Sequence, residues 1–495
     1  MSKKKQKPNR PKARRPRGFE DKSAEVIRAE NRLISAAFSV YDQNGFEPLQ
    51  TPAFEYADAL GKFLPDEDRP NTGVFALRDD DEQWMSLRYD LTAPLARFVA
   101  ENFDGLAKPY RRYQAGSVFR NEKPGPGRFR EFVQCDADSV GAPGAAADAE
   151  MVTLAANVMR AVGLKDGQYQ VRVNNRKLLD GILENTGVPN TEEGAVQRLQ
   201  VLRAIDKLDR LGVDGVEALL GEGREDESGD YTEGAKLGSA GIKAVLGFTT
   251  ASLGSRLETI ANLEGLVGSS ERGREGCQEL ADIDRILSAV GMDDTRVAFD
   301  TSIVRGLGYY TGPVFEVELL TDIKDKKGRP VRIGSIGGGG RYDDLVSRFR
   351  GQLVPATGFS FGVSRLLTAL ERLDALDIQS NPPVFISVFD KSLLGEYFKM
   401  AEEIRQSGLR AEVYVGTGNL TKQMKYADRR GVKLAVIMGE DEMSRAEVTV
   451  KDLHLGAEMA KAIQSNEEWK SSRPAQETVS RSELINFLHK VSSQK

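Results

Sequence analysis

The chain is poor in the two residue types that most often build metal and redox centres: it has only two histidines and two cysteines in 495 residues. His454 and His489 both lie near the C-terminus, which nearly excludes a histidine-based triad or a histidine-rich metal centre. Cys135 and Cys277 form no C-x-x-C pattern, so neither a disulfide framework nor a zinc site is indicated. This cysteine usage is typical of a reducing compartment, and we expect a cytoplasmic protein. Catalysis must then rest on Arg, Asp, Glu, Gln and Tyr side chains.

Long apolar runs are also missing. No run approaches the roughly 18 residues that a membrane-spanning helix needs, so we expect no membrane partner. The composition, with 40% hydrophobic and 29% charged residues, is that of a globular protein with two to four domains. Acidic residues are absent from residues 1–17, which hold nine Lys or Arg and three prolines. We predict a disordered basic tail there, which serves either as a solubilising segment or as an arm that attracts RNA.

The first large region, 18–190 with its continuation 273–378, mixes helix and strand signals. Residues 23–44 have helical spacing, and strands are predicted at Ser117–Arg120, Glu131–Val140 and Tyr169–Asn174, then at Val314–Leu320 and Val331–Ile336. Between them, residues 191–272 read as a separate helical insertion, in which Leu199, Leu202, Ile205 and Leu208 recur every three residues. The acidic stretch 221–230 within it reads as a mobile loop.

The second region begins after the break QSNPPV at 379–384. Strand and helix patterns alternate from Val384 to Lys451, which predicts a small doubly wound α/β domain over 382–463. Residues 464–495 are expected to be a polar tail with a short helix at 482–490.

Two segments invite a phosphate-binding reading. GSIGGGGRYDDL (334–345) lacks the G-K-[S/T] of a phosphate loop and the spacing of a dinucleotide site, so alone it favours a flexible loop or a close backbone approach. In residues 113–141, Arg120, Arg128 and Arg130 stand among extended segments. Residues 134, 136 and 138 share one face of a strand. A guanidinium suits phosphate or carboxylate, although a salt-bridged hairpin explains the pattern equally well.

The segment YQAGSVFRNEKPGPGRFREFVQCDADSVG (113–141) resembles motif 2 of class II aminoacyl-tRNA synthetases, and GFSFGVSRL (358–366) resembles motif 3. SLRYDLTAPLARF (86–98) and VRGLGYYTGPVFEVEL (304–319) resemble signatures of the histidyl-tRNA synthetase family. Pro52 matches the motif 1 proline, and residues 419–442 are similar to the family's anticodon-binding domain. The matches occur in order from Arg17 to about Ile463.

The resemblance implies an α+β class II catalytic domain, an antiparallel sheet with helices, followed by the α/β anticodon-binding domain. It implies a histidine–tRNA ligase that uses ATP and Mg²⁺, with L-histidine, ATP and histidine tRNA (acceptor end and anticodon) as partners and a homodimer formed near Pro52. The alternatives are a catalytically inactive regulatory subunit that senses histidine, and a pure RNA-binding or histidine-sensing domain. Arg120, Arg305 and Arg365 together argue against both, and the regulatory family typically lacks the C-terminal domain.

The resemblance also implies residue roles. Catalysis falls to Arg120 and Arg305 at the α-phosphate and the histidine carboxylate, and to Arg365 near the ATP tail. The remaining ATP contacts are Glu122, Arg128 and Phe132; the remaining histidine contacts are Asp90, Leu91, Thr92, Gln134, Asp138, Tyr309 and Tyr310; the tRNA contacts are Lys422, Lys425, Arg429 and Arg430. Mg²⁺ is expected to bridge phosphates without a dedicated protein cage.

Two positions depart from the family pattern. Gly308 stands where many relatives have an acid, so any role of that acid is absent or moved. Gly125 stands where many bacterial relatives have a glutamine in the motif 2 hairpin. Gly125 and Pro126 offer only backbone groups, so we hypothesise that the chain does not strictly require the extra 5′ guanosine of histidine tRNA. The alternative is that Lys123 or Arg128 supplies the same contact.

Overall fold

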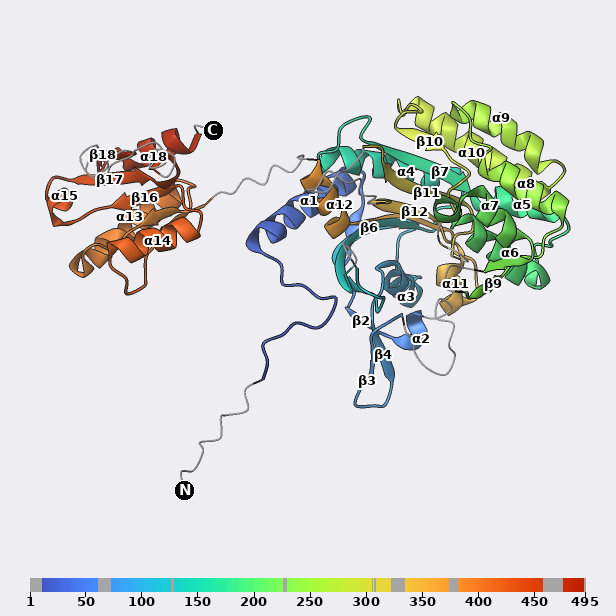
Figure 1. Cartoon of the computed structure of the whole chain (residues 1–495), viewed down its shortest axis with the longest axis horizontal. Coiled ribbons are helices and arrows are strands. Elements are labelled where there is room, and N and C mark those ends of the chain that lie inside the picture. Colours follow the sequence, from blue (N-terminus) through green and yellow to red (C-terminus); the bar gives the residue numbers. More distant parts are fainter. Residues whose placement is uncertain are drawn as a thin grey trace, which may run out of the picture. The chain divides into compact units, whose positions relative to one another are not determined.

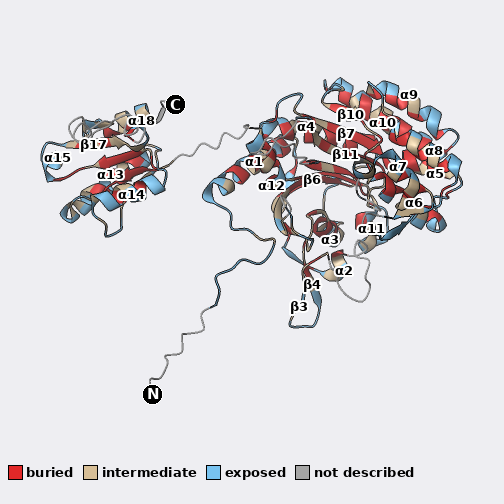
Figure 2. Ribbon diagram, in the orientation of Figure 1, coloured by how far each residue is buried: buried red, intermediate tan, exposed pale blue. Residues whose placement is uncertain are grey.

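The computed structural model describes residues 11–60, 73–125, 129–225, 229–304, 306, 309–321, 334–373, 382–456 and 475–493. The chain divides into two compact units, residues 1–377 and 378–495, each with its own hydrophobic core (Figures 1 and 2). None of the helices in these described ranges has the length and apolar character needed to span a membrane. Both histidines of the chain lie in the second unit, so the large unit contains no imidazole.

An eight-stranded sheet forms the centre of the large unit. Its inner strands pair antiparallel, and only the outermost pairs, β1 with β5 and β10 with β7, are parallel. This arrangement confirms the predicted class II α+β fold. In spatial order the strands are β1 (Glu47–Pro48), β5 (Tyr110–Phe119), β6 (Glu131–Val140), β13 (Ala356–Gly362), β12 (Gly337–Arg341), β11 (Pro313–Leu319), β7 (Tyr169–Asn175) and β10 (Val297–Phe299).

Helices cover the two faces of this sheet unequally (Figure 1). The main core lies on the face covered by α1 (Ala24–Gln43), α4 (Ala145–Ala161), α10 (Glu271–Ala289) and α12 (Val363–Arg372). The other face carries a smaller cluster with α3 (Thr92–Asn102) and α11 (Asp344–Arg350). Because side chains alternate along β6, Cys135 and Ala137 enter the main core, and Gln134, Asp136 and Asp138 face the α3 side.

Polar contacts join the N-terminal segment to the residue before β6 and to helices α1 and α12. The backbone oxygen of Gly18 accepts a hydrogen bond of 2.8 Å from the backbone N–H of Arg130. Lys22 Nζ lies 2.8 Å from Glu30, and the same carboxylate accepts a hydrogen bond of 3.0 Å from the hydroxyl of Ser364 on α12. The side chain of Ser23 caps α1 by accepting from the N–H of Val26.

A small three-stranded sheet projects from the large unit next to α2 (Ala57–Leu60) and α3. It contains β2 (Phe54–Tyr56), β4 (Trp84–Leu87) and β3 (Ala76–Arg78). Pro52 precedes β2 and is exposed.

The glycine cluster forms strand β12 in the middle of the sheet, so a loop is the wrong interpretation of this segment. The physical reason is close packing: a Cβ on Gly339 would lie 2.0 Å from the oxygen of Gly358 and 2.6 Å from the ring of Phe315. Only glycine leaves room for the neighbouring strands there. In the strand predicted at 331–336, residues 331–333 lie outside the described residues, and 334–336 are not in a strand.

Residues 191–272 are largely helical, as expected, but they share a core with the rest of the large unit rather than forming a compact unit of their own. The helices that surround this core are α5 (Arg176–Asn185), α6 (Glu192–Ile205), α7 (Leu208–Leu220), α8 (Ser239–Thr249) and α9 (Arg256–Val267). The stretch 221–230 contains a strand, β8 (Gly223–Glu225), paired with β9 (Tyr231–Glu233), instead of a loop alone. Gly223 permits this pairing, because a Cβ there would lie 2.3 Å from the oxygen of Thr232.

The second unit is a five-stranded sheet with helices. Its order is β15 (Ala411–Val413), β14 (Val384–Ile386), β16 (Leu434–Ile437), β17 (Glu447–Asp452) and β18 (Gln476–Ser480). The first three strands are parallel, and β17 pairs antiparallel with both β16 and β18. The helical elements are η2 (Lys391–Leu393), α13 (Leu394–Gln406), α14 (Leu420–Arg429), α15 (Glu440–Ser444) and α18 (Leu484–Ser493).

The expected polar tail over 464–495 is corrected for its described part, residues 475–493. Strand β18 completes the sheet, and α18 buries Leu484 and Leu488 fully in the core of this unit. The two leucines are four residues apart, on one face of the helix, which gives this otherwise polar segment its anchor.

Candidate active site

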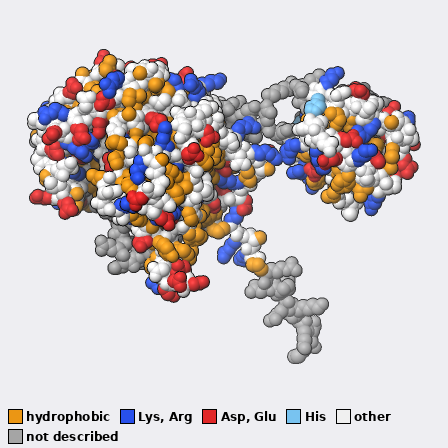
Figure 3. Space-filling view, turned by 180° about the vertical axis from the view of Figure 1, so that it is seen from behind, with side chains coloured by type: hydrophobic (Ala, Val, Ile, Leu, Met, Phe, Trp, Pro, Cys, Tyr) orange, Lys and Arg blue, Asp and Glu red, His pale blue; other side chains and the backbone are white. Residues whose placement is uncertain are grey.

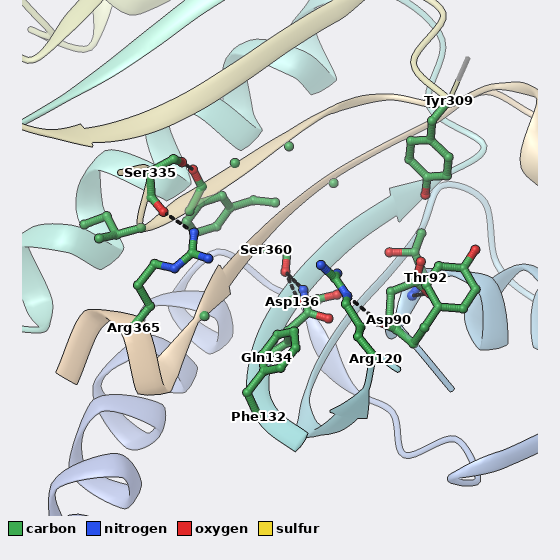
Figure 4. Close-up of a pocket in the computed structure, with 18 of the residues that line it drawn as sticks. Asp90, Thr92, Arg120, Phe132, Gln134, Asp136, Tyr309, Ser335, Ser360 and Arg365 are labelled. Atoms are coloured by element: carbon green, nitrogen blue, oxygen red, sulfur yellow. Dashed lines mark hydrogen bonds between the residues drawn. The ribbon is translucent and has the colours of Figure 1, made fainter. Parts of the chain in front are cut away.

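A cavity of about 520 Å³ opens on the α3 side of the large sheet (Figure 4). Its walls come from β6, β12, β13, the residues after β4 and the start of α12. Its lining includes ten of the side chains expected from sequence: Asp90, Thr92, Arg120, Glu122, Phe132, Gln134, Asp138, Tyr309, Tyr310 and Arg365. The structure therefore brings together residues that lie up to 275 positions apart, between Asp90 and Arg365.

Among the residues expected to bind histidine or ATP, Leu91 is the one within the described ranges that does not line this cavity. Leu91 is fully buried, and its backbone oxygen accepts a hydrogen bond of 3.0 Å from Arg112 Nη2, so its side chain serves the core. Arg128 and Arg305 lie outside the described residues.

One part of the cavity is cationic. Arg120 Nε donates to the backbone oxygen of Tyr89 at 3.2 Å, and its guanidinium lies 5.2 Å from the ring centroid of Phe132. Arg365 Nη1 donates to the backbone oxygen of Ser335 at 2.8 Å (Figure 4). A guanidinium group donates in several directions, so both arginines can also contact an anion such as a polyphosphate.

A buried polar network closes another part. Arg112 Nη2 lies 2.7 Å from Asp138 Oδ2, and both side chains are almost wholly buried. The hydroxyl of Tyr342 donates to Asp138 Oδ1. The ring of Tyr342 stacks on that of Tyr309 with centroids 5.5 Å apart, and Tyr309 meets Tyr310 edge-on at 5.0 Å. Asp138 is thus held by one ion pair and one hydrogen bond, next to two tyrosines that line the cavity.

Asp90 stands at the start of α3, where its Oδ1 accepts from the N–H groups of Thr92 at 3.1 Å and Ala93 at 2.9 Å. Burial raises the pKa of Asp90, and the hydrogen bond from Ala93 and the charge of Arg120 oppose this shift. Burial raises the pKa of Asp136 as well, and the neighbouring Asp138 adds to that shift. Three carboxyl groups near two arginines, Arg112 and Arg120, suit a ligand that carries an ammonium group.

The donor set fits ATP rather than a metal cage. Arg120 and Arg365 can hold phosphates, and the aromatic ring of Phe132 and the carboxyl group of Glu122 line the same cavity. Within the described part of the chain, no group of three or more His, Cys, Asp or Glu could hold a metal ion. Mg²⁺ bound through nucleotide phosphates needs no such group.

A family model described as histidyl-tRNA synthetase matches residues 18–366, and one described as an anticodon binding domain matches residues 383–491. The chain belongs to the histidyl-tRNA synthetase family. It is 55% identical over 483 residues to a histidine–tRNA ligase of Brucella ovis, covering 97% of this chain and 96% of that protein. It is 54% identical over 484 residues to one of Caulobacter vibrioides, covering 97% of each.

A solved histidyl-tRNA synthetase from a Nostoc species is similar in structure as well, with a TM-score of 0.73 at 27% identity, over 97% of this chain and all of that one. The anticodon-binding match extends to residue 491, so it includes β18 and all but the last two residues of α18. The boundary expected at residue 463 is therefore too early for this synthetase.

Sequence reasoning missed several side chains of this synthetase site, among them the polar residues Arg112, Asp136, Tyr342 and Ser360 that contact the predicted ones or each other. Asp136 carried a signal, because it lies between Gln134 and Asp138 on the same strand face. Arg112 pairs directly opposite Asp138, and Ser360 opposite Asp136. Which residues stand opposite each other depends on the register of the neighbouring strands, and the sequence alone does not determine that register.

Proposed function

We propose that this chain joins histidine to its tRNA in two steps at this cavity. A histidine carboxylate oxygen attacks the α-phosphorus of ATP, the bond to the β-phosphate breaks, and pyrophosphate leaves. A terminal hydroxyl of the tRNA then attacks the carbonyl carbon of the adenylate, and AMP leaves. The observation that supports this proposal is that Arg120 and Arg365 line the same cavity as a set of carboxylate and tyrosine side chains.

The arginines would bind the anionic groups of the two substrates. Arg120 and Arg305 would contact the α-phosphate and the histidine carboxylate, and Arg365 the terminal phosphates. Negative charge grows on the phosphoryl oxygens during the attack, so donors fixed in advance lower the barrier most. Mg²⁺ would neutralise further phosphate charge. Phe132, Glu122 and Arg128 would complete the nucleotide contacts.

Histidine would lie with its α-ammonium group near Asp90, Thr92 and Gln134 and its ring near Asp138, Tyr309 and Tyr310. Neutral imidazole offers one donor and one acceptor, which a carboxylate and tyrosine hydroxyls can pair. A competing apolar amino acid would leave these buried groups unpaired, a penalty that can reach about 10⁴-fold in discrimination.

The second unit would bind the anticodon region. Lys422, Lys425 and Arg429 are exposed on α14, and Arg430 just after it is exposed and pairs with Glu412 at 3.0 Å. Exposed cations of this kind contribute electrostatic affinity for RNA, whereas unpaired bases are read by hydrogen bonds and stacking.

We also propose a homodimer formed near Pro52. The adjoining small sheet exposes the large apolar side chains of Phe54, Tyr56 and Leu77. Figure 3 shows hydrophobic side chains gathered on the lower part of the large unit, above the projecting hairpin. An apolar patch of this kind is typical of a protein interface. Light scattering at micromolar concentration should give about twice the 54.4 kDa chain mass, and a monomer would contradict the dimer.

Histidine-dependent exchange of pyrophosphate into ATP tests the first step. We expect exchange with histidine and none with other amino acids, and its absence would overturn the proposal. A chain ending at residue 377 tests the role of the second unit, because it should raise the KM for tRNA far more than that for histidine. Equal damage to both would argue against an RNA-binding role.

The regulatory-subunit alternative is not favoured, because the chain matches catalytic relatives over almost their full length. A cytoplasmic location follows from the proposed role in protein synthesis.

A further inference from the structure

Gln134 has two chemically opposite ends, and the proposed function requires only one of them to face the substrate. Its Nε2 is a donor and its Oε1 an acceptor. The α-ammonium group of histidine has only donors, so it needs Oε1. Left free to rotate, the amide would present either end.

Neighbouring strands fix this choice. Ser360 on β13 lies directly opposite Asp136 on β6. Asp136 is two residues after Gln134, so the two side chains are on the same face of that strand. Gln134 Nε2 donates to Ser360 Oγ at 2.9 Å, and the Ser360 hydroxyl donates to Asp136 Oδ1 (Figure 4). A serine hydroxyl has one hydrogen. Because that hydrogen goes to Asp136, Ser360 can only accept from the amide, and Nε2 must be the end that faces it.

Gln134 Oε1 is consequently the end of the amide that does not contact Ser360. It is buried and has no hydrogen-bond partner among the described residues, although the side chain lines the cavity. A buried acceptor without a partner is rare in native proteins and is accounted for by a donor that arrives with a ligand.

We propose that Ser360, with its hydrogen held by Asp136, is a positioning residue that orients the Gln134 amide so that Oε1 accepts from the α-ammonium group of histidine. This rests on the proposed function and extends it to residues that do not contact the reacting atoms. Asp136 Oδ1 can accept from Ser360 whether the carboxyl group is ionised or carries a proton on Oδ2, so the direction of the chain of hydrogen bonds is the same in both states.

The test compares two ligands on the full-length chain. Calorimetry measures the binding of histidine and of deaminohistidine, which lacks only the α-amino group, to the wild type, S360A and S360T. S360A removes the acceptor that holds the Gln134 amide. The affinity for histidine should then fall roughly tenfold to hundredfold, the scale of one hydrogen bond to a charged group. The substitution should change the affinity for deaminohistidine less than about twofold, because that ligand makes no ammonium contact.

S360T is the matched control. It keeps the hydroxyl, and Gly338 lies opposite on the other neighbouring strand and offers no side chain against the added methyl group. We expect S360T to keep the wild-type preference for histidine over deaminohistidine. Equal weakening of both ligands by S360A would show a general packing role and overturn the proposal, and so would no change in either.

A second comparison tests the orientation of the amide directly. In Q134E both oxygens of the side chain accept, so orientation no longer matters. S360A added to Q134E should then cost less than about threefold in histidine affinity, and a loss as large as that in the wild-type background would contradict the proposal. A wild-type chain without histidine-dependent exchange would instead refute the proposed function, so the two failures are distinguishable.

Discussion

Gly358 lies directly opposite Asp138 in the catalytic sheet, and a Cβ on Gly358 would come within 2.1 Å of Asp138 Oδ1. The glycine therefore leaves the space that the carboxylate occupies between Arg112 and Tyr342. Substitution should move the carboxylate without removing any of its partners.

We expect Gly358→Ala to raise the KM for histidine roughly tenfold or more and to lower stability by about 1–3 kcal/mol, the usual cost of overpacking. Exchange kinetics and urea unfolding measure the two effects. Gly265→Ala in α9 is the control, because no atom lies within 4 Å of its Cβ and the helix should gain up to about 1 kcal/mol. An unchanged KM in Gly358→Ala would remove Asp138 from histidine binding.

Arg112→Met should destabilise the chain by about 3–5 kcal/mol, because it leaves Asp138 buried without its cation. The side chains of Arg112 and Asp138 are 0% and 3% exposed. Urea unfolding should show the loss. Arg78→Ala breaks an ion pair with Glu82 in which the side chains are 54% and 77% exposed, and it should cost under about 1 kcal/mol. Similar losses for both variants would mean that burial does not govern these pairs.

Arg305→Ala should leave the fold intact and lower pyrophosphate exchange by roughly 10²–10³, the effect of losing one donor to a developing negative charge. Circular dichroism checks the fold. Arg285→Ala on α10 is the surface control, since that arginine is 76% exposed and pairs only with Asp282 among the contacts of the described residues. Exchange within tenfold of the wild type for Arg305→Ala would remove that residue from catalysis.

Neither thiol should react in the native protein. Cys135 and Cys277 are 0% and 3% exposed, and burial raises the pKa of Cys277 to about 11 and that of Cys135 further. At pH 8 only about one Cys277 in a thousand would be a thiolate, and its reactivity should rise about tenfold per pH unit below pH 11. A colorimetric thiol reagent should count two fast-reacting thiols in denaturant and none without it. A fast native thiol would contradict this burial.

The protein should still aminoacylate a histidine tRNA that lacks the extra 5′ guanosine. Gly125 is exposed, and a Cβ there would meet nothing within 4 Å, so this position offers the nucleotide no side chain. Aminoacylation of two transcripts that differ only in that nucleotide measures the requirement. A loss above a hundredfold, about 2.7 kcal/mol, would show that the requirement persists and that Lys123 or Arg128 supplies the contact.

Much of the site could be predicted from sequence, because its residues follow local rules. Alternation along 131–140 placed Gln134 and Asp138 on one face, and the matched motifs predicted Arg120 and Arg365 in the same cavity. Arg112 and Ser360 could not be found this way, because their roles depend on which residue of the next strand stands opposite.

The fold shows the same division. Strand β6 has the bounds predicted for it, Glu131–Val140, since its pattern is continuous. Strand β12 was not predicted, because four glycines carry no strand pattern, and only the closeness of Phe315 and Gly358 explains them. Residues 475–493 were mistaken for a tail because their apolar residues are few, although Leu484 and Leu488 are enough to dock α18.

The absence of histidine from the large unit has a spectroscopic consequence. Any imidazole resonance in the proton spectrum of a chain ending at residue 377 would come from the bound amino acid, because the protein itself contributes none. Imidazole is also the side chain whose unperturbed pKa, about 6.5, falls nearest neutrality. The substrate can therefore report its own protonation state inside the pocket, without any imidazole resonance from the enzyme.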